Sequence, residues 1–204
     1  TADSGSDRPE QGDGPMPGGS VDGMTDSEAT SSSSADDATP GFRLEARRVI
    51  AAPPDRVFAV LCDPDGHVAI DSSGMLQSAE GPAVSARGDR FVVHMDRESL
   101  GDYDLGRYDV TVIISRFEPD VEIAWTIDGT IKPPIGHTYG YRLAPLPSDG
   151  DESGPLTEVV SYYDWSDAHP KWRDSGILPV LDASALKATL GILERAVRRG
   201  YVRG

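Results

Sequence analysis

The hydrophobic pattern of the chain changes character once along its length. Between residues 42 and 165, apolar residues alternate with polar ones in short runs that Gly, Pro and Asp separate, which is typical of β-strands. Over residues 177–199 the apolar residues recur at spacings of three, four and seven, which is typical of an amphipathic α-helix. The apolar stripe of that helix is too wide for a surface position. We therefore expect the helix to pack against a sheet.

The order of the predicted elements defines the fold class. FRLEARRVIA reads as a first strand, and APPDRVFAVLCDPDG and GHVAIDSS follow it as two short helical segments. The remaining strands are predicted at MLQSAE, GDRFVVHMDR, YDVTVIISRFEP, VEIAWTID, GHTYGYRLAPL and LTEVVSYYDW. Strands joined by short turns pair as antiparallel neighbours, and a sheet of that size curls. The sequence predicts an α+β protein with a curved antiparallel sheet of about seven strands around the long C-terminal helix.

A curled sheet that holds a helix encloses a space that side chains fill only in part, which is a natural apolar binding cavity. Gly191 lies within the predicted helix, and either close helix–sheet contact or room for a ligand accounts for it. Which strand faces line the cavity is left open by the alternation alone. The candidate ligand-binding residues come from alternate strand positions and one helical stripe: Phe91, Met95, Ile123, Trp125, Tyr139, Tyr141, Leu181, Ala185, Ala188 and Ile192.

Acid–base chemistry has two candidate residues, His94 and Tyr141. A histidine facing the cavity would exchange protons near neutral pH, and a phenol in an apolar cavity can orient a carbonyl or an enol. The alternative for His94 is an exposed or internally hydrogen-bonded ring. For Tyr141 the alternative is a core position with its hydroxyl bonded to a neighbour.

Composition narrows the choice of partners. The net charge of -15 argues against nucleic acid and anionic membranes, because phosphate recognition needs clustered Lys and Arg. Residues 1–40 are acidic and rich in Ser, Gly and Pro, which predicts a disordered tail before a folded domain at 41–204. No run of apolar residues is long enough for membrane insertion, and no signal peptide is recognisable, so a cytoplasmic protein is expected.

Neither the single cysteine, Cys62, nor the spacing of the four histidines predicts a metal site, and no cofactor is expected.

Four features of the sequence resemble one family. VIAAPPDRVFAVLCDP is similar to its strand-to-helix entry, SRFEPDVEIAWTI to its Glu-Pro turn followed by a Trp-containing strand, and TEVVSYYDWS to the last strand of its bacterial members. The fourth feature is the long C-terminal helix. Together they resemble the helix-grip fold of the START-like or SRPBCC superfamily, which includes polyketide cyclases and dehydrases and lipid-transport proteins. The resemblance spans residues 42 to 199.

The resemblance implies a cavity but no shared catalytic motif, so no catalytic residue carries over. It favours binding of a small hydrophobic or aromatic ligand, such as a lipid, a polyketide or an isoprenoid-like metabolite. One alternative is a polyketide cyclase or dehydrase that uses a cavity tyrosine or histidine as acid or base. A second alternative is a non-catalytic module that binds a protein partner.

Overall fold

The computed structural model describes residues 41–101, 104–147 and 154–201 of the 204-residue chain. The predicted acidic tail, residues 1–40, lies outside the described residues. No helix in the described ranges is long and apolar enough to cross a membrane.

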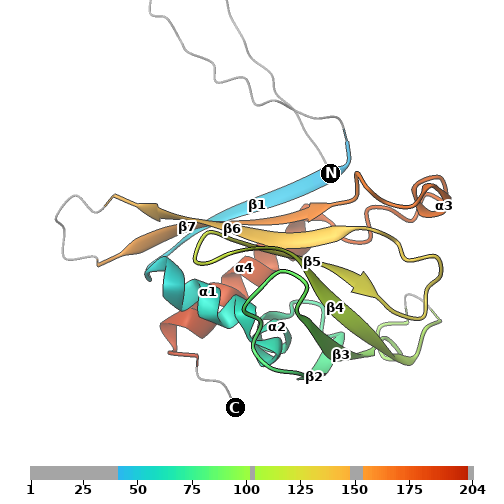
Figure 1. Cartoon of the computed structure of the whole chain (residues 1–204), viewed down its shortest axis with the longest axis horizontal. Helices are drawn as coiled ribbons and strands as arrows, with labels where there is room; N and C mark the ends of the chain where they lie inside the picture. Colours follow the sequence, from blue (N-terminus) through green and yellow to red (C-terminus); the bar gives the residue numbers. More distant parts are fainter. Residues whose placement is uncertain (1–40, 102–103, 148–153, 202–204) are drawn as a thin grey trace, which may run out of the picture. The chain divides into compact units, whose positions relative to one another are not determined.

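Seven antiparallel strands form one sheet, as the alternation predicted. They run in the spatial order β1-β7-β6-β5-β4-β3-β2. The first strand therefore pairs with the last, and all other neighbouring strands are consecutive in sequence. Figure 1 shows this sheet curving over the helices. The strands are β1 (Arg43–Ile50), β2 (Leu76–Glu80), β3 (Arg90–Asp96), β4 (Arg107–Glu118), β5 (Glu122–Asp128), β6 (Thr138–Leu146) and β7 (Leu156–Asp164).

Two short helices follow the first strand, also as predicted. Helix α1 (Pro54–Cys62) and helix α2 (Pro64–Ile70) each begin with a proline, which is tolerated because the first-turn N–H groups have no partner in the helix. Asp63 separates them. Its side chain accepts a hydrogen bond from the backbone N–H of Asp65 and another from the hydroxyl of Tyr201 at 3.0 Å. This buried carboxylate therefore links α2 to the chain beyond the terminal helix.

The C-terminal helix is shorter than the sequence predicted. Helix α4 (Ala183–Arg198) begins six residues after the predicted start at Ile177, and a four-residue helix, α3 (Pro170–Arg173), lies in the loop before it. The cause is local: Asp182 caps α4 by accepting hydrogen bonds from the backbone N–H groups of Ser184 and Ala185. Pro179 cannot donate a backbone hydrogen bond to a longer helix. Residues 177–182 therefore form an extended approach to α4.

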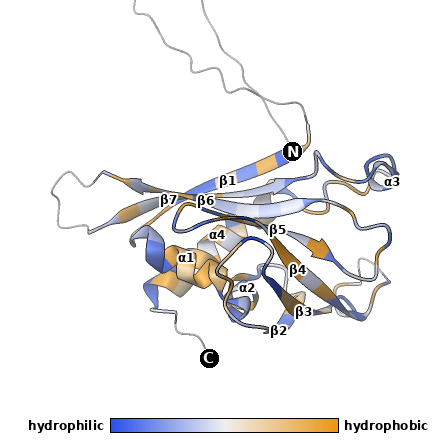
Figure 2. Cartoon of the chain, viewed as in Figure 1, coloured by the Kyte–Doolittle hydropathy of each residue, from blue (hydrophilic) through white to orange (hydrophobic). Residues whose placement is uncertain are grey.

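The core lies between α4 and the concave face of the sheet. Helix α4 packs against β1 and β7, with α1 and α2 beside it (Figure 1). Figure 2 shows hydrophobic residues concentrated on α1 and β4. The helix buries one apolar stripe, made of Leu186, Leu190, Leu193 and Val197.

Gly191 lies on the side of α4 that approaches β1. A Cβ atom there would stand 4.0 Å from the Nη1 atom of Arg48, which is an ordinary contact distance. Arg48 forms an ion pair with Glu194 one turn further along α4. A methyl group at this position would therefore fit without displacing the sheet.

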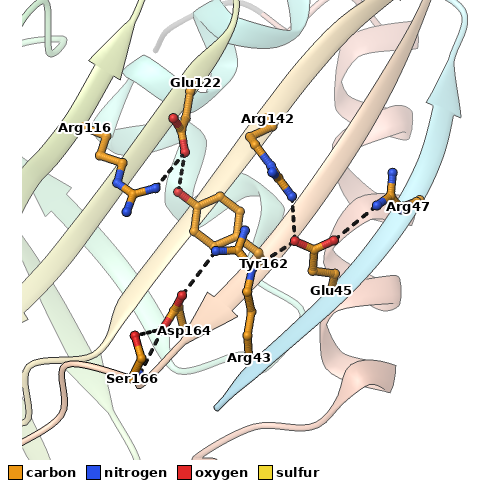
Figure 3. A network of polar contacts seen from close by, with 9 residues as sticks. All are labelled: Arg43, Glu45, Arg47, Arg116, Glu122, Arg142, Tyr162, Asp164 and Ser166. Carbon is orange, nitrogen blue, oxygen red and sulfur yellow. Dashed lines mark hydrogen bonds and ion pairs between the residues drawn. The ribbon is translucent and has the colours of Figure 1, made fainter. Parts of the chain in front are cut away.

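The outer face of the sheet carries a polar network around Tyr162 (Figure 3). The Tyr162 ring is buried although it lies on this outer face, and the guanidinium carbon of Arg43 sits 4.1 Å above its centroid. Its hydroxyl donates a hydrogen bond of 2.7 Å to Glu122 on β5. The ring rests on the bare backbone of Gly140 on β6, where a side chain would leave it no room. The network thus connects β1, β7, β6 and β5.

The variant Gly140→Ala is expected to lose stability. Its new Cβ would overlap the Cζ and Oη atoms of Tyr162 and stand 2.9 Å from the Cβ of Ala124, so the ring must leave its position. Overpacking of this kind costs about 1–3 kcal/mol, measured as the free energy of unfolding in urea. In a Tyr162→Ala background the same substitution should cost much less. An equal loss in both backgrounds would show that the ring is not what excludes a side chain at Gly140.

Candidate functional site

A continuous array of aromatic rings lines the concave face across β5, β6 and β7. Strand pairing brings the rings together, because Trp125 lies opposite Tyr139, which in turn lies opposite Tyr163. The ring centroids of Trp125 and Tyr139 are 6.3 Å apart, and those of Tyr139 and Tyr163 are 4.8 Å apart. Tyr141 stacks on the other side of Trp125 at 6.0 Å, and Trp165 stacks on Tyr163 at 5.1 Å. Such offset contacts stabilise the rings beyond their burial alone.

The array is buried except at its central ring, Tyr139. Trp125, Tyr141 and Tyr163 are buried, whereas Tyr139 is only partly buried. The partly exposed apolar side chains that pack on the same core include Met95 of β3, Tyr108 of β4, Ile127 of β5, and Leu178 and Leu181 in the approach to α4. Because Met95 and Tyr108 are paired across β3 and β4, they form one patch on the concave face.

Two histidines are built into this interior, and both are held neutral. The ring of His67 on α2 lies 4.6 Å from that of Trp125 and 4.9 Å from that of Phe91, and its Nε2–H donates to the backbone carbonyl of Leu61 at 2.9 Å. Burial lowers the pKa of His67 to about 4, although the Leu61 carbonyl and the Asp63 carboxylate oppose the shift. Burial also lowers the pKa of His137 to about 4. Neither ring carries charge at neutral pH.

The tyrosine hydroxyls of the array differ in their partners. The Tyr163 hydroxyl accepts a hydrogen bond from the backbone N–H of Val180 and lies 3.0 Å from Nδ1 of His137, so it has two hydrogen-bond partners. The Tyr141 hydroxyl bonds to Ser161, and burial raises its pKa to about 12. Burial likewise raises the pKa of the Tyr139 hydroxyl far above its usual value, but that hydroxyl has no hydrogen-bond partner among the described residues.

The structure separates the two candidate acid–base residues. Tyr141 lies in the interior, whereas His94 lies on the outer face of β3 with its Nδ1 atom 2.7 Å from Asp109 and its Nε2 atom 3.3 Å from Glu80. Hydrogen bonding to Asp109 raises the pKa of His94, opposite to the effect of burial on the interior histidines. The sheet therefore stands between His94 and Tyr141, and they cannot act on one substrate atom together.

His94 lines an open hollow of about 510 Å³ over β2, β3 and β4. By strand alternation its neighbours Asp96, Arg107 and Asp109 lie on the outer face as well. Asp96 and Arg107 are paired with each other at 3.0 Å. Met95 and Tyr108 of the concave face also line the hollow, so it has a polar outer part and an apolar part that adjoins the concave patch.

The structure also decides which predicted ligand-binding residues lie together. On the sheet Phe91, Ile123, Trp125 and Tyr141 are buried, while Met95 and Tyr139 are partly exposed. On the helix Leu181, Ala185 and Ile192 are partly exposed, and Ala188 is exposed to solvent. The prediction for Ala188 was wrong, because α4 turns its leucine stripe to the sheet and Ala188 away from it.

Sequence reasoning did not select three residues that the structure places in or beside the array. Tyr108 and Tyr163 follow the same alternation as their buried strand neighbours, so extending the pattern to the strand ends would have found them. His67 carried no such signal. It lies on a seven-residue helix, and only the packing of α2 under the sheet brings its ring to Trp125.

Comparison with solved structures identifies the architecture. A protein of Rhodobacter sphaeroides superimposes with a TM-score of 0.54 at 19% identity, covering 79% of this chain and 96% of that one. The chain has the helix-grip fold. Protein Ms6760 of Mycobacterium smegmatis shares this helix-grip fold, with a TM-score of 0.51 at 13% identity over 78% of this chain and 93% of that one.

Sequence comparison adds one relative. This helix-grip chain is 26% identical over 170 residues to the uncharacterized protein Rv0088 of Mycobacterium tuberculosis, an alignment that covers 80% of this chain and 67% of Rv0088. No family model matches the chain.

Protonation of the interior histidines is expected to make the helix-grip domain sensitive to acid. A histidine with a native pKa of about 4 and an unfolded pKa near 6.5 binds more protons when unfolded between those values. Its contribution to stability is complete above pH 6.5 and is lost as the pH falls to 4, by up to about 3 kcal/mol for a fully buried ring. His67→Gln should therefore reduce the slope of unfolding free energy against pH in that window.

The matched control is His169→Gln, since His169 is exposed on the loop before α3. Both variants and the parent chain are unfolded in urea at intervals from pH 4 to pH 7. An unchanged slope in His67→Gln would mean that the ring is protonated in the folded protein over this range.

Proposed function

We propose that this protein binds a small apolar ligand with aromatic or conjugated character against the concave face of its sheet. One observation carries the proposal: Tyr139 of the aromatic array and the paired Tyr108 and Met95 are partly exposed on the concave face instead of being sealed by the core. A ligand there would stack against Tyr139 and cover apolar side chains that now contact water. The approach to α4, with Leu178 and Leu181, would provide a second apolar wall.

The expected driving force is burial of apolar surface. At about 25 cal/mol per Å², covering roughly 200 Å² of apolar surface contributes about 5 kcal/mol before the costs of association. The histidines and tyrosines of the array add no charge that a ligand would have to neutralise, because His67 and His137 are neutral and the tyrosines stay protonated. The fold supports the same conclusion, because the START-like superfamily that it resembles shares a cavity.

The geometry favours binding over the cyclase or dehydrase alternative. His94 and Tyr141 face opposite sides of the sheet, and the Tyr163 hydroxyl already has two hydrogen-bond partners, His137 and the backbone of Val180. The alternative of a protein-binding module depended partly on residues 1–40, which lie outside the described residues.

Filling the patch should weaken binding. Met95→Trp places a larger side chain on the concave face of β3, and we expect at least a tenfold weaker affinity for N-phenyl-1-naphthylamine, an uncharged fluorescent probe. Affinity is measured by titration of the probe's fluorescence, with folding checked by circular dichroism. Val92→Trp is the matched control, because Val92 is on the same strand and faces the other side of the sheet.

The outer hollow is tested in the same experiment with Asp109→Trp. Binding that survives Met95→Trp but is lost in Asp109→Trp would assign the probe to the outer hollow and overturn the proposal. An absence of binding to the parent chain would overturn it as well.

A further inference from the structure

Two phenol hydroxyls on the concave face lack the partners that the other tyrosines of the fold have. Tyr141 bonds to Ser161, Tyr163 to His137 and Val180, and Tyr162 on the outer face to Glu122. The hydroxyl of Tyr139 has no hydrogen bond to any described residue, and neither has the hydroxyl of Tyr108.

The Tyr139 hydroxyl is deeply set and yet remains accessible. The one fully buried side-chain polar atom without a partner among the described residues is Ser115 Oγ, so the unpartnered Tyr139 hydroxyl must still contact solvent. Its ring is fixed between Trp125 and Tyr163, which holds the hydroxyl in one position. Burial raises the pKa of Tyr139, and the nearby Tyr163 and Tyr108 raise it further, so the hydroxyl keeps its proton and acts as a donor at neutral pH.

An accessible donor in apolar surroundings is stabilised by an acceptor on the molecule that enters. We propose that the ligand carries an uncharged carbonyl oxygen, which accepts a hydrogen bond from the hydroxyl of Tyr139. This inference rests on the proposed function, because it assigns the ligand's polar group to the same concave patch. The ligand class is an apolar aryl or conjugated ketone.

An uncharged acceptor fits the patch better than a carboxylate. A buried carboxylate needs a cation, and both interior histidines are neutral. Arg97 is the least of the four influences on the pKa of Tyr139, after burial, Tyr163 and Tyr108, and Arg97 has a partner of its own. A ketone oxygen accepts the hydrogen bond of the Tyr139 hydroxyl without bringing a charge into the interior.

Three naphthalene compounds of similar shape test the inference: 2-acetylnaphthalene, 2-isopropylnaphthalene and 2-naphthoate. The full chain is titrated with each by isothermal calorimetry at pH 7. We expect the ketone to bind about tenfold more tightly than the hydrocarbon, and the carboxylate to bind most weakly. Tyr139→Phe should remove most of the ketone's advantage and should leave the affinity for the hydrocarbon unchanged.

Tyr162→Phe is the matched control, since its hydroxyl bonds to Glu122 on the other face. It should lower stability without changing the preference for the ketone. Tyr139→Phe should keep or raise the melting temperature, because the hydroxyl it removes has no partner in the folded chain. A lower melting temperature in Tyr139→Phe would show that the hydroxyl serves the fold and would overturn the inference.

The outcomes separate the two proposals. Equal affinity for ketone and hydrocarbon, unchanged by Tyr139→Phe, would overturn the carbonyl inference and leave the apolar site standing. Tighter binding of the carboxylate would also overturn it. If none of the three compounds bound, both the inference and the proposed function would fail.

Discussion

The structure depends on the contact between one stripe of α4 and the concave face of the sheet. Leu186, Leu190, Leu193 and Val197 recur at helical spacing and are all buried, so the helix can lie on the sheet in only one rotation about its axis. That rotation turns Gly191 toward β1. It also directs Glu194 to its ion pair with Arg48. Because this contact defines the inner face of each strand, it also decides that Trp125, Tyr139 and Tyr163 become neighbours in the interior.

The tyrosines on the two faces of the sheet differ in the hydrogen-bond partners of their hydroxyls. On the outer face Tyr162 is covered by Arg43, bonded to Glu122 and seated on the backbone of Gly140, so every atom of it contributes to the fold. On the inner face Tyr141 is equally satisfied, but Tyr139 is not. A folded chain gains nothing from holding a donor in apolar surroundings without an acceptor. The unpaired hydroxyl of Tyr139 therefore marks the centre of the array as the place where a ligand would supply an acceptor.

Much of the fold could be predicted because strand alternation and helical spacing are local signals. The seven strands, the two short helices and the terminal helix follow from them. The alternation left open which face of each strand points inward, and the structure places Phe91, Trp125 and Tyr141 in the interior. The helical stripe could not be chosen in the same way, because two adjacent stripes of α4 are apolar in sequence. Ala188 was assigned to the interior on the second of them, and it is exposed. Only the packing of the whole domain distinguishes the two stripes.

The placement of charge explains why this interior suits an uncharged ligand. The chain carries a net charge of -15, yet burial keeps His67 and His137 deprotonated and Tyr139 protonated, so these groups of the concave face are neutral at pH 7. The charged partners gather on the outer face instead, where Arg43 and Arg142 meet Glu45 in contact with solvent (Figure 3). Removing a charge from water costs far more than removing a carbonyl that finds donors. A molecule that binds on the concave side therefore loses the least binding free energy to desolvation when its single polar group is neutral and accepts a hydrogen bond from the hydroxyl of Tyr139.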